Sequence, residues 1–364
     1  MKKLICGTLM ALYGAFMAFP GYAQDWKAQL VAAAEKEGSL ILHSQPNLAA
    51  REFIQQEWSK AFPKIALSLS VMATPPFLAR FRTERSTGNY LWDVGLSGYT
   101  TGYLLAKEGG VDEVLPEIID PDIKRPELWG GWNSAFVDVP GKYVFSVSQF
   151  TKGVYFNALQ VSPDEIRAKG IQILLDPKYK GKAIWHDPTT PGSGDLYPFF
   201  LQRRIGDEGL RKLVVDQRIQ WTAQQQEVVE AMVRGTAYFG MGPAVTGLLG
   251  QYQKAGVKLD IRAFGNTPEL NDMSIGGSCL YVFNRRPHPN ATRLFVNWLL
   301  TKDVQYGLAK AMIQNSRRRD VPAVTPPDET AVPGATYLEN QREEYVEKAQ
   351  AARSLVAGYR KQVQ

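Results

Sequence analysis

Residues 185–195 read WHDPTTPGSGD, and they place a histidine, two aspartates, three hydroxyl side chains and two glycines in one short segment. The segment follows a predicted strand over 183–187 and precedes a predicted helix over 194–205. Backbone N–H groups at the start of a helix lack helical partners and carry partial positive charge. The pattern therefore predicts a cradle for an anionic or polar group. An ordinary capped helix start is the alternative.

In such a cradle the glycines let the backbone approach a ligand, and the hydroxyl groups add hydrogen-bond donors. The residues that we expect to contribute are Thr189, Thr190, Ser193, Gly194 and Asp195.

A serine hydrolase is a second interpretation of the same segment. Ser193 would be the nucleophile, and His186 with Asp187 or Asp195 would complete a catalytic triad. Residues 191–195, PGSGD, do not match the Gly-x-Ser-x-Gly nucleophile elbow. Triad partners usually come from distant parts of the chain, whereas His186 lies just before Ser193. We therefore expect no enzyme activity, and an exported hydrolase remains as an alternative.

The histidines do not form a metal-binding pattern. They are His43, His186 and His288, in three separate segments, without a His-Glu-x-x-His motif or a cysteine pair. We expect neither a metal site nor a cofactor from them. His288 lies in an exposed turn, and His43 ends a predicted strand, where it is either a pocket-rim residue or a simple strand-end histidine.

Short strands and helices alternate along most of the chain, which predicts an α/β fold with mostly parallel sheets and crossover helices. Strands are expected at 39–44, 65–71, 92–96, 183–187, 219–222, 236–241, 257–263 and 276–284. Helices are expected at 25–37, 47–62, 77–87, 100–108, 194–205, 207–216, 225–234 and 338–360. Residues 143–157 read as two extended runs joined at 149–152.

This organisation predicts two lobes joined by two crossing strands. Lobe 1 would comprise residues 24–145 and 273–320, lobe 2 residues 146–272, and a tail with a final helix residues 321–364.

The first 23 residues are typical of a secretory signal peptide, because Lys2 and Lys3 precede an apolar run and Gly21 and Ala23 suit the cleavage site. No later stretch reaches the roughly 20 apolar residues that a membrane span needs. We expect an exported, periplasmic protein. Cleavage would leave Cys279 as the one cysteine and would exclude an intrachain disulfide.

The net charge of +6 falls by two, to +4, when Lys2 and Lys3 are removed. Charges of both signs are interspersed, and Arg317–Arg319 forms the one tight basic run, which we interpret as a solvated loop. The charge pattern predicts no nucleic-acid partner.

Three segments together resemble the solute-binding proteins of ABC importers, in the branch that includes the periplasmic ferric-binding proteins. They are LLDPKYKGKAIWHDPTTPGSG (174–194), VVEAMVRGTAYFGMG (228–242) and NRRPHPNATRLFVNWLLTKDVQ (284–305). The resemblance covers essentially the whole mature chain. It implies a type II periplasmic binding fold, a cleft between two lobes with a two-strand hinge, and closure on a small-molecule solute. It also implies a partner permease in the inner membrane, and we expect a monomer.

One feature of the ferric-binding relatives is absent. They hold iron largely through an adjacent pair of tyrosines after the strand that reads TAYFGMG here, and this chain continues Pro243-Ala244-Val245. Phenolate oxygens suit ferric iron, and the thioether of Met241 does not. We therefore extend the fold and the transport role to this chain without iron, and ferric iron with a companion anion remains an alternative.

Side chains at the carboxyl ends of parallel strands face the crevice of an α/β sheet, which predicts further cleft residues. From lobe 1 these are His43, Ser44, Gln45, Thr74, Ser97, Gly98 and Tyr99, and from lobe 2 they are Gln225, Gln226, Met241 and Gly242. The resemblance adds Thr151 and Lys152, which occupy the place of a serine and an arginine that hold the companion anion in ferric-binding relatives.

We therefore expect a small organic anion, carboxylate or phosphonate-like, held by the cradle and Lys152. Asp195 leaves a question open, because a carboxylate facing the cleft would oppose an anion and favour an amine.

Overall fold

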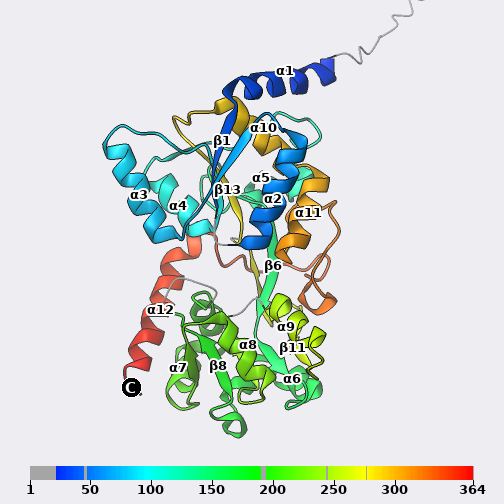
Figure 1. Cartoon of the computed structure of the whole chain (residues 1–364). Coiled ribbons are helices and arrows are strands. Elements are labelled where there is room, and N and C mark those ends of the chain that lie inside the picture. Colours follow the sequence, from blue (N-terminus) through cyan, green and yellow to red (C-terminus); the bar gives the residue numbers. More distant parts are fainter. Residues whose placement is uncertain (1–21, 45–46, 190–193, 243–244, 276, 364) are drawn as a thin grey trace, which may run out of the picture.

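The computed structural model of the chain describes residues 22–44, 47–189, 194–242, 245–275 and 277–363. It consists of two lobes, which lie one above the other in Figure 1, and each lobe is a sheet flanked by helices. In the described ranges, no helix combines the length and the apolar character needed to cross a membrane. The predicted α/β architecture is confirmed.

Lobe 1 is built on a sheet of strand order β2-β1-β3-β13-β4, with β5 also paired to β13. The strands are β1 (Ser39–Ser44), β2 (Ala66–Val71), β3 (Val94–Ser97), β4 (Val111–Asp112), β5 (Phe145–Ser146) and β13 (Cys279–Phe283). The helices are α1 (Tyr22–Glu37), α2 (Leu48–Ala61), α3 (Thr74–Ser86), α4 (Tyr99–Lys107), α5 (Trp132–Ala135), α10 (Pro289–Leu299) and α11 (Lys302–Met312). Strand β1 runs parallel to β2 and β3, so their carboxyl ends meet at one edge.

Lobe 2 has the strand order β11-β7-β10-β8-β9. The strands are β7 (Tyr155–Asn157), β8 (Ala183–His186), β9 (Gln220–Thr222), β10 (Phe239–Met241) and β11 (Ile261–Ala263). The helices are α6 (Pro163–Lys169), α7 (Tyr197–Val215), α8 (Gln225–Val233) and α9 (Val245–Lys254). Strand β8 is parallel to both β9 and β10. Gly206 has φ 69° and ψ 177° and breaks α7, which agrees with the two helices predicted there.

The lobes are joined through a small sheet of strand order β12-β6-β14, in which β6 (Ser148–Gly153) and β12 (Asn271–Ser274) are antiparallel. Figure 1 shows β6 running from one lobe to the other. These are the two crossing strands that the sequence predicted, and β14 (Asn315–Ser316) pairs with β6 in addition. Residues 149–152 were expected to join two extended runs. They lie inside β6 instead, so Thr151 and Lys152 belong to the hinge.

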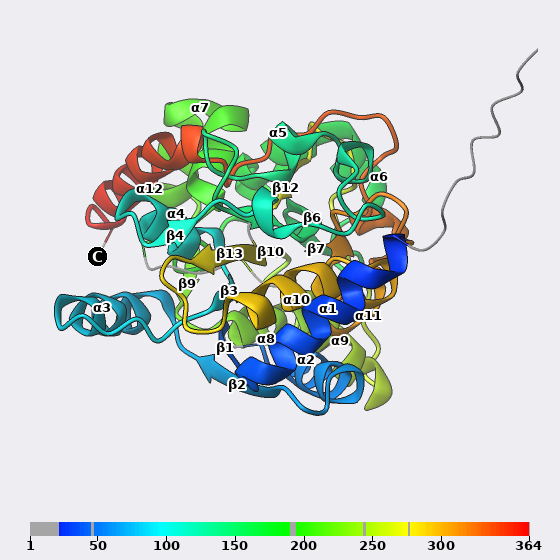
Figure 2. The same cartoon turned by 90° about the horizontal axis from the view of Figure 1, so that it is seen from above.

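The final helix, α12 (Val346–Arg360), packs on lobe 2, beside α7 in both Figure 1 and Figure 2. Val356 is fully buried in the core of lobe 2, and Ala352 packs with Phe199 of α7. The helix begins at Val346 and not at the predicted residue 338.

The basic run Arg317–Arg319 differs from the solvated loop that we expected. Arg317 and Arg318 are only 6% and 7% exposed. Arg317 is ion-paired with Glu339 at 2.6 Å, and Arg318 with Asp320 at 2.8 Å. Glu339 from later in the chain and the neighbouring Asp320 make burial of these two guanidinium groups possible, so the prediction of a solvated loop was wrong for both.

Candidate ligand-binding site

The segments that follow β8 and β10 lie side by side in lobe 2. Met241 at the end of β10 is in register with Trp185 in β8. Gly242 has φ 108°, and a Cβ at this position would lie 2.5 Å from the Cβ of His186 and 3.3 Å from the Cα of Gly194. A side chain would not fit here, so the close approach of the two segments requires glycine.

The described residues of the predicted cradle form hydrogen bonds with one another and with neighbouring backbone. The Nδ1 atom of His186 accepts a hydrogen bond from the Gly194 N–H at 3.2 Å, and Nε2 donates to the carbonyl of Ala223 at 3.2 Å. The backbone N–H and the hydroxyl of Thr189 both donate to Asp187, at 2.9 Å and 2.6 Å. These donors therefore stabilise the segment itself, contrary to the expectation that they are free for a ligand.

The helix after the cradle also begins later than predicted. Gly194 lies in a turn, and α7 begins at Tyr197 with Leu196 as its N-cap. Thr190 and Ser193, which were predicted to supply hydroxyl donors, lie outside the described residues.

Both aspartates of the segment are paired with arginines of α12. The carboxylate of Asp195 lies 3.4 Å from Nη1 of Arg353, and that of Asp187 lies 2.6 Å from Nη1 of Arg360. No local pattern marks these arginines, because they lie 158 and 173 residues further along the chain. Sequence reasoning missed them for this reason.

Lys152 is a buried cation in the hinge, only 9% exposed. Its Nζ lies 5.3 Å from the centroid of the Tyr197 ring, within the range of a cation–π contact. Lys152, Leu196 and Tyr197 line the same small void, so the lysine lies beside the turn that contains Asp195. Burial lowers the pKa of Lys152 to about 8, while the Asp195 carboxylate acts in the opposite direction.

Tyr99 of lobe 1 is also influenced by Asp195, as Lys152 is. It is half-buried at the start of α4. Burial raises the pKa of the Tyr99 phenol, and the nearby Asp195 carboxylate raises it further. Asp195 of lobe 2 thus acts electrostatically on two other predicted residues, Tyr99 of lobe 1 and Lys152 of the hinge.

His43 and Ser97 lie in a buried hydrogen-bond chain of lobe 1. The Ser97 hydroxyl and the Tyr281 hydroxyl are 2.8 Å apart, and the latter lies 2.8 Å from Nδ1 of His43. Nε2 of His43 contacts the carbonyl of Met72 at 3.3 Å, and its ring stacks on Phe77. Burial lowers the pKa of His43 to about 4, so the ring is neutral at pH 7. In the structure His43 is thus a core residue of the strand end and does not lie on a pocket rim.

The remaining predicted residues differ in exposure. Ser44, Thr151, Met241 and Gly242 are buried, Thr74 and Gly98 are half-buried, and Gln225 and Gln226 are exposed. The Thr151 hydroxyl donates to the carbonyl of Glu329 at 2.7 Å, and Met241 packs in the core of lobe 2. The structure does not describe Gln45.

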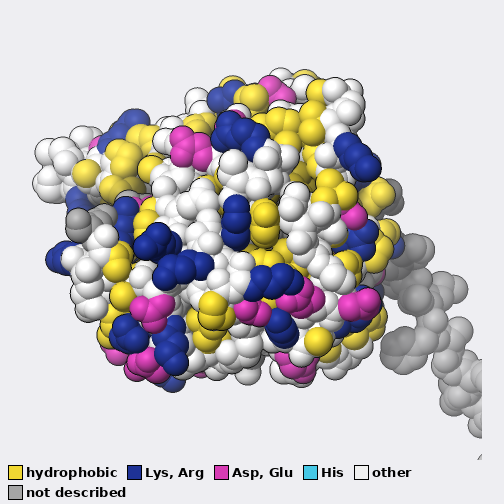
Figure 3. Space-filling model, turned by 90° about the horizontal axis from the view of Figure 1, so that it is seen from below, with side chains coloured by type: hydrophobic (Ala, Val, Ile, Leu, Met, Phe, Trp, Pro, Cys, Tyr) yellow, Lys and Arg dark blue, Asp and Glu magenta, His cyan; other side chains and the backbone are white. Residues whose placement is uncertain are grey.

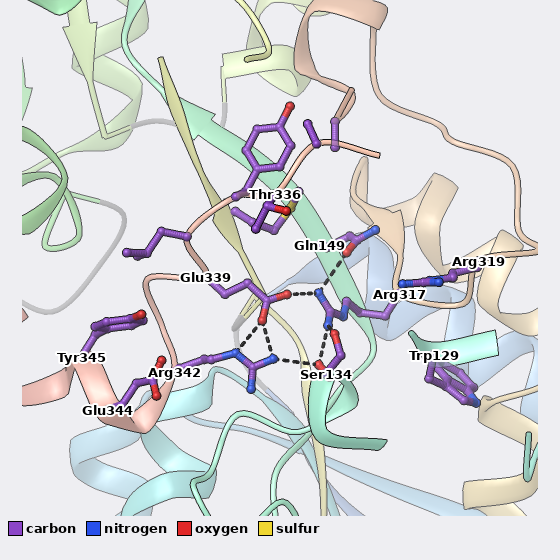
Figure 4. Close-up of a pocket in the computed structure, with 15 residues that line it drawn as sticks. Trp129, Ser134, Gln149, Arg317, Arg319, Thr336, Glu339, Arg342, Glu344 and Tyr345 are labelled. Carbon is purple, nitrogen blue, oxygen red and sulfur yellow. Dashed lines mark hydrogen bonds and ion pairs between the residues drawn. The ribbon is translucent and has the colours of Figure 1, made fainter. Parts of the chain in front are cut away.

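A cavity of about 480 Å³ lies elsewhere, beside the hinge, and none of the predicted binding residues lines it. Figure 4 shows that Arg317 and Arg342 of its lining both contact Glu339, whereas Arg319 and Glu344 lie apart from this group. Glu339 accepts hydrogen bonds from Arg317 and Arg342, each at 2.6 Å. Three arginines and two glutamates line this cavity, so its charges sum to +1. We place the proposed site at Lys152 instead, because the residues that the sequence predicts to bind lie there and not in this cavity.

In the part of the chain that the structure describes, no three side chains of His, Cys, Asp or Glu lie together as a metal site. Cys279 is free and buried, and burial raises the pKa of its thiol. The thiol is therefore a poor metal ligand at neutral pH.

No family model matches the chain, and neither does any curated protein. Solved structures do match. Iron-bound HitA from Pseudomonas aeruginosa matches with a TM-score of 0.64 at 14% identity, over 88% of this chain and 99% of that one. IdiA (FutA) from Trichodesmium, solved with iron and citrate, matches with a TM-score of 0.66 at 14% identity, over 88% and 99%.

A third structure is the periplasmic binding protein AfuA from Actinobacillus pleuropneumoniae, solved with fructose-6-phosphate. It matches with a TM-score of 0.59 at 15% identity, over 90% of this chain and 98% of that one. Likeness at such low identity establishes the fold and leaves the ligand to be argued from the site. The chain has the two-lobed α/β fold of the periplasmic binding proteins.

Proposed function

We propose that this protein is the solute-binding receptor of an ABC importer, and that it captures a small organic anion between its lobes and delivers it to a permease in the inner membrane. The observation that carries the proposal is a buried lysine in the hinge, Lys152, whose ammonium lies over the Tyr197 ring of lobe 2. Asp195 of lobe 2 acts electrostatically on both this lysine and Tyr99 of lobe 1. Ligands of two-lobed proteins bind where both lobes reach them, and binding then favours the closed arrangement. Affinity and closure are the whole mechanism.

The charges around Lys152 favour an anion. Lys152 and Arg353 each contribute one positive charge and Asp195 one negative charge, so these three groups sum to +1. The ion pair with Arg353 supports an anion as the ligand in spite of Asp195, because a paired carboxylate opposes an anion much less than a lone one. Carboxylates and phosphonates present the oxygen acceptors that Lys152 and Tyr99 would bind.

Among the described residues, one face of the molecule shows no basic patch of the kind that a nucleic-acid site needs. On the face seen in Figure 3, Lys and Arg side chains are scattered among Asp and Glu and do not form one basic patch. A nucleic-acid site would need such a patch.

His186 is unsuited to the role of catalytic base that the hydrolase alternative gives it. Its two ring nitrogens are bonded to the Gly194 N–H and the Ala223 carbonyl. A base would need a free lone pair directed at the nucleophile. We therefore propose a receptor without catalytic activity, exported to the periplasm by the signal peptide expected in residues 1–23 and acting as a monomer.

The test is thermal unfolding of residues 24–364 with citrate, succinate, phosphate, methylphosphonate, putrescine and ferric chloride. A ligand that binds only the folded state raises the melting temperature. We expect a rise with at least one of the four anions and none with putrescine. Melting temperatures unchanged by all four anions would exclude the proposal, and a coloured, ferric-loaded protein would favour the iron alternative.

Lys152→Met tests the residue that we expect to bind the anion. Methionine keeps the length and removes a charge that burial disfavours, so the melting temperature without ligand should not fall. The rise with the anion should disappear. Lys124→Met is the matched control, because Lys124 is an exposed lysine of lobe 1. An unchanged response of Lys152→Met would show that the anion binds elsewhere.

A further inference from the structure

The final helix carries two arginines on one face, and both contact the segment after β8. Arg353 and Arg360 are two helical turns apart in α12, so their side chains project from the same side. Arg353 is paired with Asp195 and Arg360 with Asp187, and all four side chains are half-buried. This shielding makes the pairs stronger than exposed ones.

Arg360 also belongs to a stack of aromatic rings beneath the same segment. Its guanidinium lies 5.0 Å from the ring centroid of Trp221, and the Trp221 ring stacks on Trp185 at 5.4 Å. Nε1 of Trp185 donates to the carbonyl of Gly194 at 3.3 Å. The helix therefore holds the segment at both described ends, beside Asp187 and beside Gly194.

The chain before α12 is tied to lobe 1, while α12 packs on lobe 2. Arg342 donates to the carbonyl of Phe136 at 2.9 Å, and Glu343 accepts from the backbone of Val139 at 2.8 Å and pairs with Lys107 at 2.6 Å. Figure 4 shows Arg342 and Glu339 of this segment against Arg317 and Ser134. Residues 339–360, which we name the C-terminal strap, thus connect the lobes in addition to the hinge.

We propose that Arg353 of the C-terminal strap determines the charge preference of the inter-lobe site, because it neutralises the carboxylate of Asp195 next to Lys152. The inference rests on the proposed function and adds a residue that sets its specificity. Leu196, the residue after Asp195, lines one void with Lys152 and Tyr197. The Asp195 carboxylate acts electrostatically on the buried ammonium of Lys152. With Arg353 present the three charges sum to +1 and favour an anion. Without Arg353 they sum to zero.

Two substitutions with opposite expected effects separate this role from a structural one. Arg353→Ala leaves the Asp195 charge uncompensated, so the Kd for the anion should rise by about tenfold. Asp195→Asn removes that charge, so the Kd should fall below that of the wild type. The double variant Arg353→Ala/Asp195→Asn should return close to the wild-type Kd. If the pair only held the segment in place, both single variants would weaken binding and the double variant would remain weak.

The Kd values are measured by isothermal titration calorimetry. The ligand is whichever anion raises the melting temperature of the wild type most, among citrate, succinate, phosphate and methylphosphonate. Arg353→Lys keeps the charge and should keep the affinity. Lys361→Ala makes the same change in net charge at an exposed position just after α12, and should leave the Kd unchanged. Circular dichroism melting of each variant shows that it is folded.

The outcomes distinguish the two proposals. If the wild type binds an anion and Asp195→Asn weakens that binding, Arg353 does not set the charge preference, and the receptor function stands. If the wild type binds none of the four anions, the receptor for anions and the role of Arg353 are both excluded. Both proposals would be supported if Asp195→Asn binds the anion more tightly than the wild type and Arg353→Ala binds it more weakly.

Discussion

The ammonium group of Lys152 lies 5.3 Å from the centroid of the Tyr197 ring, between the hinge strand β6 and the first turn of α7. The hydroxyl of the same tyrosine donates to the carbonyl of Gly153, next to Lys152, at 2.7 Å. One aromatic side chain of lobe 2 thus fixes both the backbone and the charged end of the hinge. The proposed anion partner is therefore held in place by the element about which the lobes close.

Anion binding should weaken as the pH rises through 8. Burial lowers the pKa of Lys152 to about 8, so its charged fraction falls from about 0.9 at pH 7 to about 0.1 at pH 9. We expect the Kd for a carboxylate such as succinate, whose own charge is nearly constant in this range, to increase about tenfold. Titration calorimetry at pH 7, 8 and 9 measures it, and Lys152→Met should remove the dependence. A wild-type Kd that stays constant would contradict the assignment of Lys152.

The protein should lose stability in mild acid because of His43. Its folded pKa, about 4, lies below the ordinary value of 6.5, so the folded state favours the neutral ring. The stabilisation is complete above pH 6.5 and is lost as the pH falls toward 4. Between pH 7 and pH 4.5 the free energy of unfolding should fall by roughly 2 to 3 kcal/mol from this group. Urea unfolding at both pH values tests this, and the fall should be smaller in His43→Gln.

Gly242→Ala should destabilise lobe 2 more than a comparable change at an open glycine. Its φ of 108° disfavours a side chain, and the new Cβ would lie 2.5 Å from the Cβ of His186. We expect a loss of about 3 kcal/mol in the free energy of unfolding. Gly256 has φ 78°, and a Cβ added there would meet no atom within 4 Å, so Gly256→Ala should cost only about 1 kcal/mol. Equal losses in the two variants would mean that contact with His186 is unimportant.

Asp272→Asn should destabilise the hinge. The Asp272 carboxylate is fully buried in β12, pairs with Arg203 and Arg204, and accepts from Asn340 at 3.2 Å. Asparagine keeps the shape but leaves two arginines without their anion, which should cost about 3 kcal/mol in the free energy of unfolding. Asp164→Asn breaks an exposed pair with Arg167 and should show no measurable change. Equal effects would contradict a special role for the buried pair.

Local sequence patterns were sufficient for most of the elements. The predicted strand at 39–44 coincides with β1, and the predicted break between helices at residue 206 coincides with the φ of 69° at Gly206. Such patterns report a local balance of hydrogen bonding and burial, which neighbouring residues largely determine. The expectation of two lobes follows from the order of these elements, because the chain contains two series of strands joined by crossover helices.

The site was predicted less completely, because its partners come from distant parts of the chain. Tyr99 and Asp195 were predicted from their positions after strands and Lys152 from the resemblance, and in the structure Asp195 acts electrostatically on the other two. The hydrogen bond between His43 and Tyr281, 238 residues apart, places His43 in the core. A strand-end position alone gives no information about such a partner.

The sequence by itself determined the α/β class, the two lobes and the chemical types available at the strand ends, since these depend on periodicity and on residue chemistry. Only the tertiary structure decided which charges are paired. It joins Asp195 to Arg353 and Asp187 to Arg360, and it buries Arg317 against Glu339. The groups within a few ångströms of a charged side chain decide whether it forms an ion pair, is available to a ligand or destabilises the fold. Packing between elements that are remote in sequence decides which groups lie that close.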